Sequence, residues 1–177
     1  MKNIIDCYIL AGGKSSRMGT DKGLLLFNGK PLVQRIIEQL SPVVNEVIIV
    51  SNNHKYEQFG LQVIGDLIKN IGPAGGIHGA LSNAQTAQIF IVSCDMPFIT
   101  AHAAKYIMQH AAYSQITLPL YHGKIQPLFG VYSRPCLPKW NQLMQQGIIK
   151  LQEMIMHFDL LKIDTQKNEL FVDLLFT

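Results

Sequence analysis

Apolar residues follow two alternating patterns from the start of the chain to about residue 111. Short unbroken apolar runs predict strands that are buried on both faces, and apolar residues that recur every three to four positions predict helices. Thr100 is a residue type that caps helix N-termini. The expected strands are 4–10, 46–51, 61–66 and 88–95, and the expected helices are one that opens at Pro31 and is ended by Pro42, 53–60, 76–84 and 100–111.

The pattern is looser beyond residue 111. Residues 116–132 are expected to form two strands around a turn at Gly123, followed by helices at about 137–146 and 148–158 and a strand at 160–164. Strand–helix alternation of this kind is typical of an open, mostly parallel sheet with helices on both faces. We therefore expect an α/β fold, a single three-layer Rossmann-like domain over residues 1–177.

Three residues stand at the carboxyl ends of predicted strands: Leu10, Asp66 and Asp95. Ligands of open α/β sheets bind beyond these ends. We therefore expect Leu10, Asp66 and Asp95 to meet in one cleft.

Composition narrows the class of protein. Hydrophobic residues make up 48% of the 177 residues and charged residues 15%, which argues for a well-buried globule. The net charge of +3 is too small to indicate nucleic-acid binding, and no apolar stretch approaches the roughly 18 residues of a membrane span. Three cysteines without CxxC spacing predict free thiols in a reducing cytoplasm, so a cytoplasmic protein without nucleic-acid or membrane partners is expected.

The segment "LAGGKSSRMGTDK" (10–22) carries the clearest chemical signal. Residues 14–30 hold four cations and one acid, an excess as large as the net charge of the whole chain. Glycine lets a backbone approach a ligand closely and cations favour an anion, so this loop predicts a phosphate site. A P-loop is disfavoured because Tyr8 stands where its first glycine belongs, and the dinucleotide fingerprint lacks its third glycine.

Four ordered motifs then carry a resemblance to a known family. They are "LAGGKSSRMGTDKGLLLFNGKPL" (10–32), "GPAGGIHGAL" (72–81), "VSCDMPFI" (92–99) and "QPLFGVY" (126–132). Together they resemble the molybdenum cofactor guanylyltransferases of the nucleotidyltransferase superfamily. The resemblance implies a fold of the nucleoside-diphospho-sugar transferase type and a transfer of GMP from GTP to molybdopterin, with Mg²⁺ as cofactor. It leaves room for transient contact with other proteins of cofactor biosynthesis.

The reaction class and the residues agree. Attack of an acceptor phosphate on the α-phosphorus of a nucleotide joins two anions, so charge neutralisation and alignment dominate and no protein nucleophile is required. We expect Arg17 and Lys22 to be catalytic and Asp95 to bind the metal, because Mg²⁺ needs only one or two carboxylates besides phosphate. The expected nucleotide-binding residues are Leu10, Ala11, Gly12, Gly13, Lys22, Asp66 and Asp95.

Two departures from the family pattern leave alternatives open. The family's F-x-N-x-N-T-P segment corresponds here to "LFVDLLFT", where Asp173 and Leu174 replace polar amides. We expect residues 1–100 to bind the nucleotide and residues 101–177, with an atypical C-terminus, to bind the acceptor. A related cytidylyl- or sugar-phosphate nucleotidyltransferase, or a GTP-binding homologue without transfer activity, remains an alternative. Either Asn52 or Asn53 is expected to reach the nucleoside.

Overall fold

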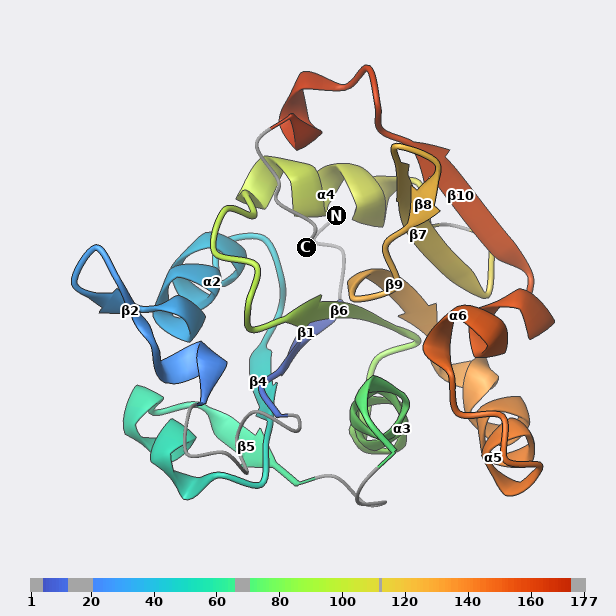
Figure 1. Cartoon of the computed structure of the whole chain (residues 1–177), viewed down its shortest axis with the longest axis horizontal. Helices are drawn as coiled ribbons and strands as arrows, with labels where there is room; N and C mark the ends of the chain where they lie inside the picture. The colour runs from blue at the N-terminus through green and yellow to red at the C-terminus, as the bar shows by residue number, and fades with distance from the viewer. Residues whose placement is uncertain (1–4, 13–20, 66–70, 112, 173–177) are drawn as a thin grey trace.

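The computed structural model describes residues 5–12, 21–65, 71–111 and 113–172. Within these ranges eight strands form one central sheet (Figure 1), in the order β10-β7-β9-β6-β1-β4-β5 with β8 paired to β7. Its strands are β1 (Asp6–Leu10), β4 (Val47–Val50), β5 (Gln62–Ile64), β6 (Gln88–Ser93), β7 (Ile116–Tyr121), β8 (Lys124–Ile125), β9 (Phe129–Ser133) and β10 (Leu160–Asp164). A separate small hairpin is formed by β2 (Leu26–Phe27) and β3 (Lys30–Pro31).

The sheet is mostly parallel, as the sequence predicts. Strand β1 pairs in parallel with both β4 and β6, β4 with β5, and β10 with β7. Antiparallel pairing is found where β9 lies between β6 and β7, and where β8 meets β7. The region 116–132 therefore holds three strands instead of the two expected. The second expected strand is divided in two, because β8 ends at Ile125 and β9 begins only at Phe129.

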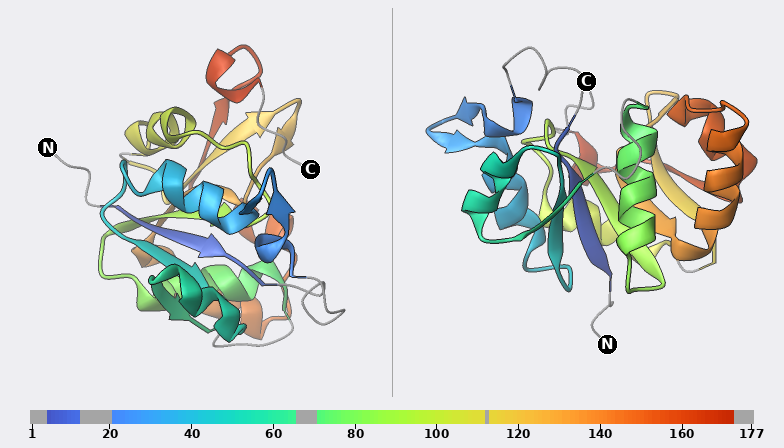
Figure 2. Two further views of the ribbon diagram at one scale, coloured as in Figure 1. Left: turned by 90° about the vertical axis from the view of Figure 1, so that its left-hand side faces the viewer. Right: turned by 90° about the horizontal axis from the view of Figure 1, so that it is seen from below.

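Helices cover both faces of the sheet, which confirms the three-layer expectation (Figure 2). On one face lie α2 (Leu32–Leu40) and α4 (Ala101–Gln109), and on the other lie α3 (Pro73–Asn83), α5 (Leu137–Gln145) and α6 (Leu151–Met154). Short 3-10 helices connect these elements: η1 (Lys22–Leu24), η2 (His54–Phe59), η3 (Arg134–Cys136), η4 (Ile155–His157) and η5 (Glu169–Phe171).

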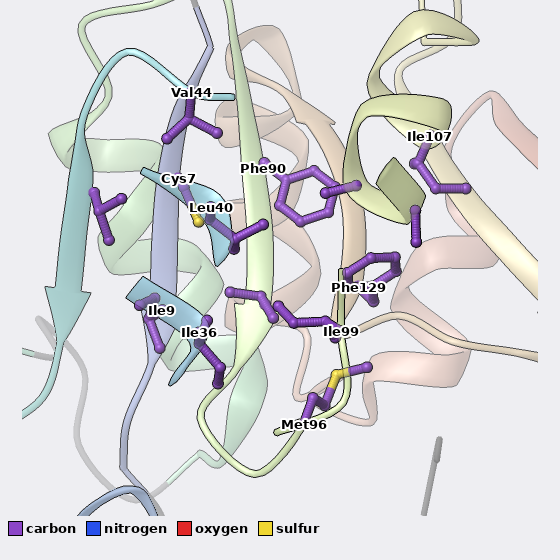
Figure 3. Close-up of a cluster of buried hydrophobic side chains, with 14 of the residues drawn as sticks. Cys7, Ile9, Ile36, Leu40, Val44, Phe90, Met96, Ile99, Ile107 and Phe129 are labelled. Atoms are coloured by element: carbon purple, nitrogen blue, oxygen red, sulfur yellow. The ribbon is translucent and has the colours of Figure 1, made fainter. Parts of the chain in front are cut away.

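The core consists of two clusters, one on each side of the sheet, and β1 contributes to both. Cys7 and Ile9 face the cluster under α2 and α4 (Figure 3), whereas Tyr8 and Leu10 face the cluster under α3 and α5. Successive side chains of a strand point to opposite faces, so an unbroken apolar run is what a strand covered on both sides requires. Trp140 is buried in the second cluster, where its Nε1 donates a hydrogen bond to the Ala74 carbonyl at 3.1 Å.

Helix boundaries follow identifiable local signals. Helix α2 ends at Leu40, which confirms that Pro42 stops it, because proline has no N–H to continue the ladder. Helix α3 begins three residues before the expected start, where Gly72 adopts φ 66° and Pro73 occupies the first turn. The Thr100 cap is confirmed, since its side chain accepts a hydrogen bond from the Ala103 N–H at 3.1 Å. In the described ranges, no helix has the length and apolar character to cross a bilayer.

The glycine of the "QPLFGVY" motif marks a close approach between strands. A Cβ on Gly130 in β9 would overlap the Thr117 carbonyl oxygen and the Leu118 side chain of β7. Glycine in a strand often marks such a place. The size of this residue therefore fixes how closely β7 and β9 pack.

We expect Gly130→Ala to lower the free energy of unfolding by about 2–3 kcal/mol, since a backbone oxygen cannot move aside as a flexible side chain can. Urea unfolding followed by Trp140 fluorescence measures the change. Gly12→Ala is the matched control for stability, because a Cβ there meets no atom of the described residues within 4 Å. Equal stabilities of the two variants would contradict this account of β9.

Candidate active site

The carboxyl ends of β1, β4 and β6 lie side by side at one edge of the sheet. Leu10 is in register with Val50 of β4 and Ser93 of β6. The Ala11 N–H donates to the Val50 carbonyl at 2.9 Å, and the Cys94 N–H donates to the Leu10 carbonyl at 3.0 Å. The loops that follow β1 and β6 therefore leave the sheet from adjacent positions, with Gly12 exposed at its edge.

Lys22 and Asp95 meet at this edge, although 73 positions separate them in the chain. The Lys22 Nζ lies 3.5 Å from the Asp95 Oδ2, and the two side chains are 55% and 35% exposed. The other carboxylate oxygen of Asp95 accepts a hydrogen bond from the Ser93 hydroxyl at 2.6 Å. Ser93 thus orients Asp95 while leaving one oxygen turned toward Lys22 and solvent.

Three expected site residues, Gly13, Arg17 and Asp66, lie outside the described residues. The structure places Leu10, Ala11, Gly12, Lys22 and Asp95 along the same sheet edge. The expected meeting of strand ends is thus found for β1 and β6. Strand β5 ends at Ile64, before Asp66 is reached.

Asp21 is an anchor that the sequence reasoning missed. Its side chain caps η1 by accepting from the Gly23 N–H at 3.3 Å. Two side chains from the segment after β4 bind the same carboxylate: the Asn53 amide donates to Oδ2 at 2.9 Å, and the Tyr56 hydroxyl donates to Oδ1. The sequence pattern places Tyr56 in a short helix, and no spacing in the sequence pairs it with Asp21.

Both polar atoms of the Asn53 side chain make hydrogen bonds within the protein. While its nitrogen donates to Asp21, its Oδ1 accepts from the Lys55 N–H at 3.0 Å and so caps η2. Of the two asparagines expected to compete for the nucleoside, Asn53 is thus already engaged within the protein.

Gly23 packs closely between Tyr56 of η2 and Cys94, which follows β6. A Cβ at this position would overlap the Tyr56 hydroxyl and come within 3.1 Å of the Cys94 Cβ. Burial, and then the hydrogen bond to Asp21, raises the pKa of Tyr56, while burial raises the pKa of the Cys94 thiol to about 12. Both groups are therefore protonated at neutral pH, and Cys94 acts as a small packing residue and not as a nucleophile.

Comparison with known proteins identifies the family of the chain. The family profile described as the MobA-like NTP transferase domain matches residues 7–159. A protein named molybdenum cofactor guanylyltransferase from Vibrio parahaemolyticus is 38% identical over 148 residues, covering 81% of this chain and 75% of that protein. A protein named "Probable molybdenum cofactor guanylyltransferase" from Flavobacterium johnsoniae is 34% identical over 149 residues, covering 84% of this chain and 78% of that protein.

Solved structures confirm the fold. The crystal structure of molybdopterin-guanine dinucleotide biosynthesis protein A from Archaeoglobus fulgidus superposes with a TM-score of 0.75 at 22% identity, covering 90% of this chain and 83% of that chain. The expected nucleoside-diphospho-sugar transferase architecture is thereby confirmed. The family profile and the sequence matches show that the chain belongs to the MobA-like NTP transferase family, among the molybdenum cofactor guanylyltransferases that its motifs resemble.

Proposed function

We propose that the protein transfers GMP from GTP to molybdopterin and releases pyrophosphate. Family membership supports the reaction, because the relatives described above carry the name of this activity. The observation that carries the proposal within the structure is the approach of Lys22 Nζ to Asp95 Oδ2, 3.5 Å, at the carboxyl edge of the sheet. Residues 1–100 would bind the nucleotide and residues 101–177 the acceptor.

The reaction balances without a covalent enzyme intermediate. A phosphate oxygen of molybdopterin attacks the α-phosphorus of GTP, and the bond from that phosphorus to the β-phosphate bridging oxygen breaks. The electron pair of that bond leaves with pyrophosphate. Negative charge grows on the leaving group, so a fixed cation near it lowers the barrier.

Each residue has a role that suits its chemistry. Lys22 would neutralise charge on the phosphates, and the backbone N–H groups from Leu10 to Gly12 would line the nucleotide as the chain leaves the sheet. Gly13 would extend that backbone cradle and Arg17 would add a second cation. Asp66 would contact the nucleoside.

Asp95 would hold the metal ion. Nucleotidyltransferases of this family are generally dependent on a divalent metal, and we propose Mg²⁺. In the described part of the chain, no group of three or more His, Cys, Asp or Glu residues could form a metal cage. A single half-exposed carboxylate fits Mg²⁺, which takes one or two carboxylates and completes its shell with phosphate and water. The ion would offset negative charge on the bound phosphates.

The proposed setting is the cytoplasm, with GTP and molybdopterin as ligands and neither nucleic acid nor membrane as a partner. The relatives' names favour GTP over CTP or UTP. A nucleotide-binding protein without transfer activity is the second candidate. It would bind Mg·GTP and release no pyrophosphate when molybdopterin is supplied.

We expect GTP to bind more tightly than CTP, UTP or ATP in a titration with Mg²⁺, measured by calorimetry. Preference for CTP would indicate a cytidylyltransferase, and preference for UTP a sugar-phosphate nucleotidyltransferase. Either result would overturn the choice of nucleotide. Pyrophosphate release on adding molybdopterin then separates the enzyme from the binding protein.

We expect Lys22→Ala and Asp95→Ala each to lower turnover by about 10²–10³, the typical loss when one electrostatic donor is removed from a reacting centre. Raising the Mg²⁺ concentration should partly restore turnover in Asp95→Ala, because a weakened metal site is refilled by mass action. It should not restore Lys22→Ala.

A second lysine–carboxylate pair in the chain supplies the matched controls. Lys30 Nζ lies 3.0 Å from Glu38 Oε1, and these side chains are as exposed as the candidate pair. Lys30→Ala and Glu38→Ala should retain wild-type turnover. Wild-type turnover in Lys22→Ala or Asp95→Ala would contradict the roles assigned to them.

A further inference from the structure

We infer that Tyr56 is a positioning residue: its hydroxyl holds the Asp21 carboxylate, and through Asp21 it fixes the short turn that presents Lys22. This inference rests on the proposed function of Lys22. It assigns an effect on the reaction to Tyr56, a side chain that is fully buried.

The turn that carries Lys22 cannot hold its own position. Helix η1 is three residues long, and an isolated turn of this length is unstable because one hydrogen bond does not offset the fixed dihedral angles. The Lys22 side chain is 55% exposed, so packing around it restrains it little. The position of its charge therefore depends on what fixes the backbone from Asp21 to Gly23.

Asp21 supplies that restraint with more partners than a helix cap needs. A capping side chain commonly accepts from one or two backbone N–H groups of its own helix. Here the carboxylate also accepts from Asn53 at 2.9 Å and from the Tyr56 hydroxyl, which lie 32 and 35 positions further along the chain. These bonds tie η1 to the segment that follows β4, and so to the sheet.

The segment that holds Asp21 is itself rigid. Asn53 caps the start of η2, and Gly60 at φ 68° ends it. The Tyr56 ring is buried in the cluster under α2, and the space above its hydroxyl is closed by Gly23. Tyr56 therefore fixes the position of η1 in two ways, by its contact with Gly23 and by its hydrogen bond to Asp21.

The same hydrogen bonds also offset the negative charge of Asp21 next to the proposed phosphate site. A carboxylate beside an anion site repels the ligand and competes for the neighbouring cation. With three donors on Asp21, its charge is compensated from the protein side, and Lys22 pairs with Asp95 at the sheet edge and not with its chain neighbour. The arrangement leaves the lysine directed to the place where the phosphates would bind.

A double-mutant cycle between Tyr56→Phe and Lys22→Ala tests the inference. Tyr56→Phe removes one hydroxyl, and we expect kcat to fall about tenfold with little change in the KM for GTP, as loss of one hydrogen bond to a charged group predicts. If Tyr56 acts through Lys22, Tyr56→Phe should have no further effect on kcat in the Lys22→Ala protein. The affinity for Mg·GTP is measured across the same four proteins.

Tyr8→Phe is the matched control. Tyr8 is also a buried tyrosine, and its hydroxyl donates to Asn83 at 3.0 Å on the opposite face of the sheet. We expect it to change the melting temperature about as much as Tyr56→Phe and to leave kcat unchanged. If Tyr56→Phe proves unstable, Asp21→Asn takes its place in the cycle. It replaces the carboxylate that accepts from Asn53 and Tyr56 by a neutral amide, and its effect on kcat should likewise be non-additive with that of Lys22→Ala.

Three results would overturn the inference: additive effects of Tyr56→Phe and Lys22→Ala on kcat, an equal loss of kcat in Tyr8→Phe, or wild-type kinetics in Tyr56→Phe. A wild-type protein that binds nucleotide without turnover would instead overturn the proposed function. In that case the affinity for Mg·GTP decides the role of Tyr56: a loss of affinity in Tyr56→Phe that disappears in the Lys22→Ala background supports it, whereas no loss, or the same loss in both backgrounds, rejects it.

Discussion

The parallel pairing of β1 with both β4 and β6 is the constraint on which the rest of the structure depends. It places three strand ends at one edge, with Leu10 in register with Val50 and Ser93. Parallel strands need long crossover connections, and these supply the helices of both outer layers. Because β1 is buried on both faces, its side chains hold the two core clusters together while its carboxyl end opens toward solvent.

At this edge of the sheet, the residues that support the site differ in exposure from the residues that are proposed to act in the reaction. The residues that support the site, Tyr56, Gly23 and Cys94, are buried, whereas Lys22 and Asp95 remain partly exposed. An exposed ion pair at 3.5 Å adds little to folding stability, since solvent screens the attraction. The pair therefore contributes little to the fold, which is consistent with the roles in ligand binding proposed for both groups.

Three glycines allow close approaches between elements of the fold. Gly23 approaches Tyr56, and Gly76 of α3 approaches Leu10 so closely that an added Cβ would lie 3.3 Å from its side chain. Gly130 does the same between β7 and β9. In each case the missing Cβ leaves room for a neighbouring atom that another residue would displace: a side-chain atom at Gly23 and Gly76, and the Thr117 carbonyl oxygen as well as a side chain at Gly130. Glycines in three of the family-like motifs are therefore required by packing.

The sequence by itself determined the layered α/β fold, because buried strands and amphipathic helices have different periods that are legible without tertiary contacts. It also placed Leu10 and Asp95 at or close to the carboxyl ends of two strands, since strand ends follow from where apolar runs stop, although β6 ends at Ser93 and only the structure shows that β1 and β6 are neighbours. Only the tertiary structure decided what holds Lys22. The hydrogen bonds from Asn53 and Tyr56 to Asp21 join residues more than thirty positions apart, and no local pattern encodes a pairing that depends on how η1 and η2 are packed. For the same reason, the commitment of Asn53 to Asp21 and to its own helix cap became visible only when the strands were assembled into a sheet.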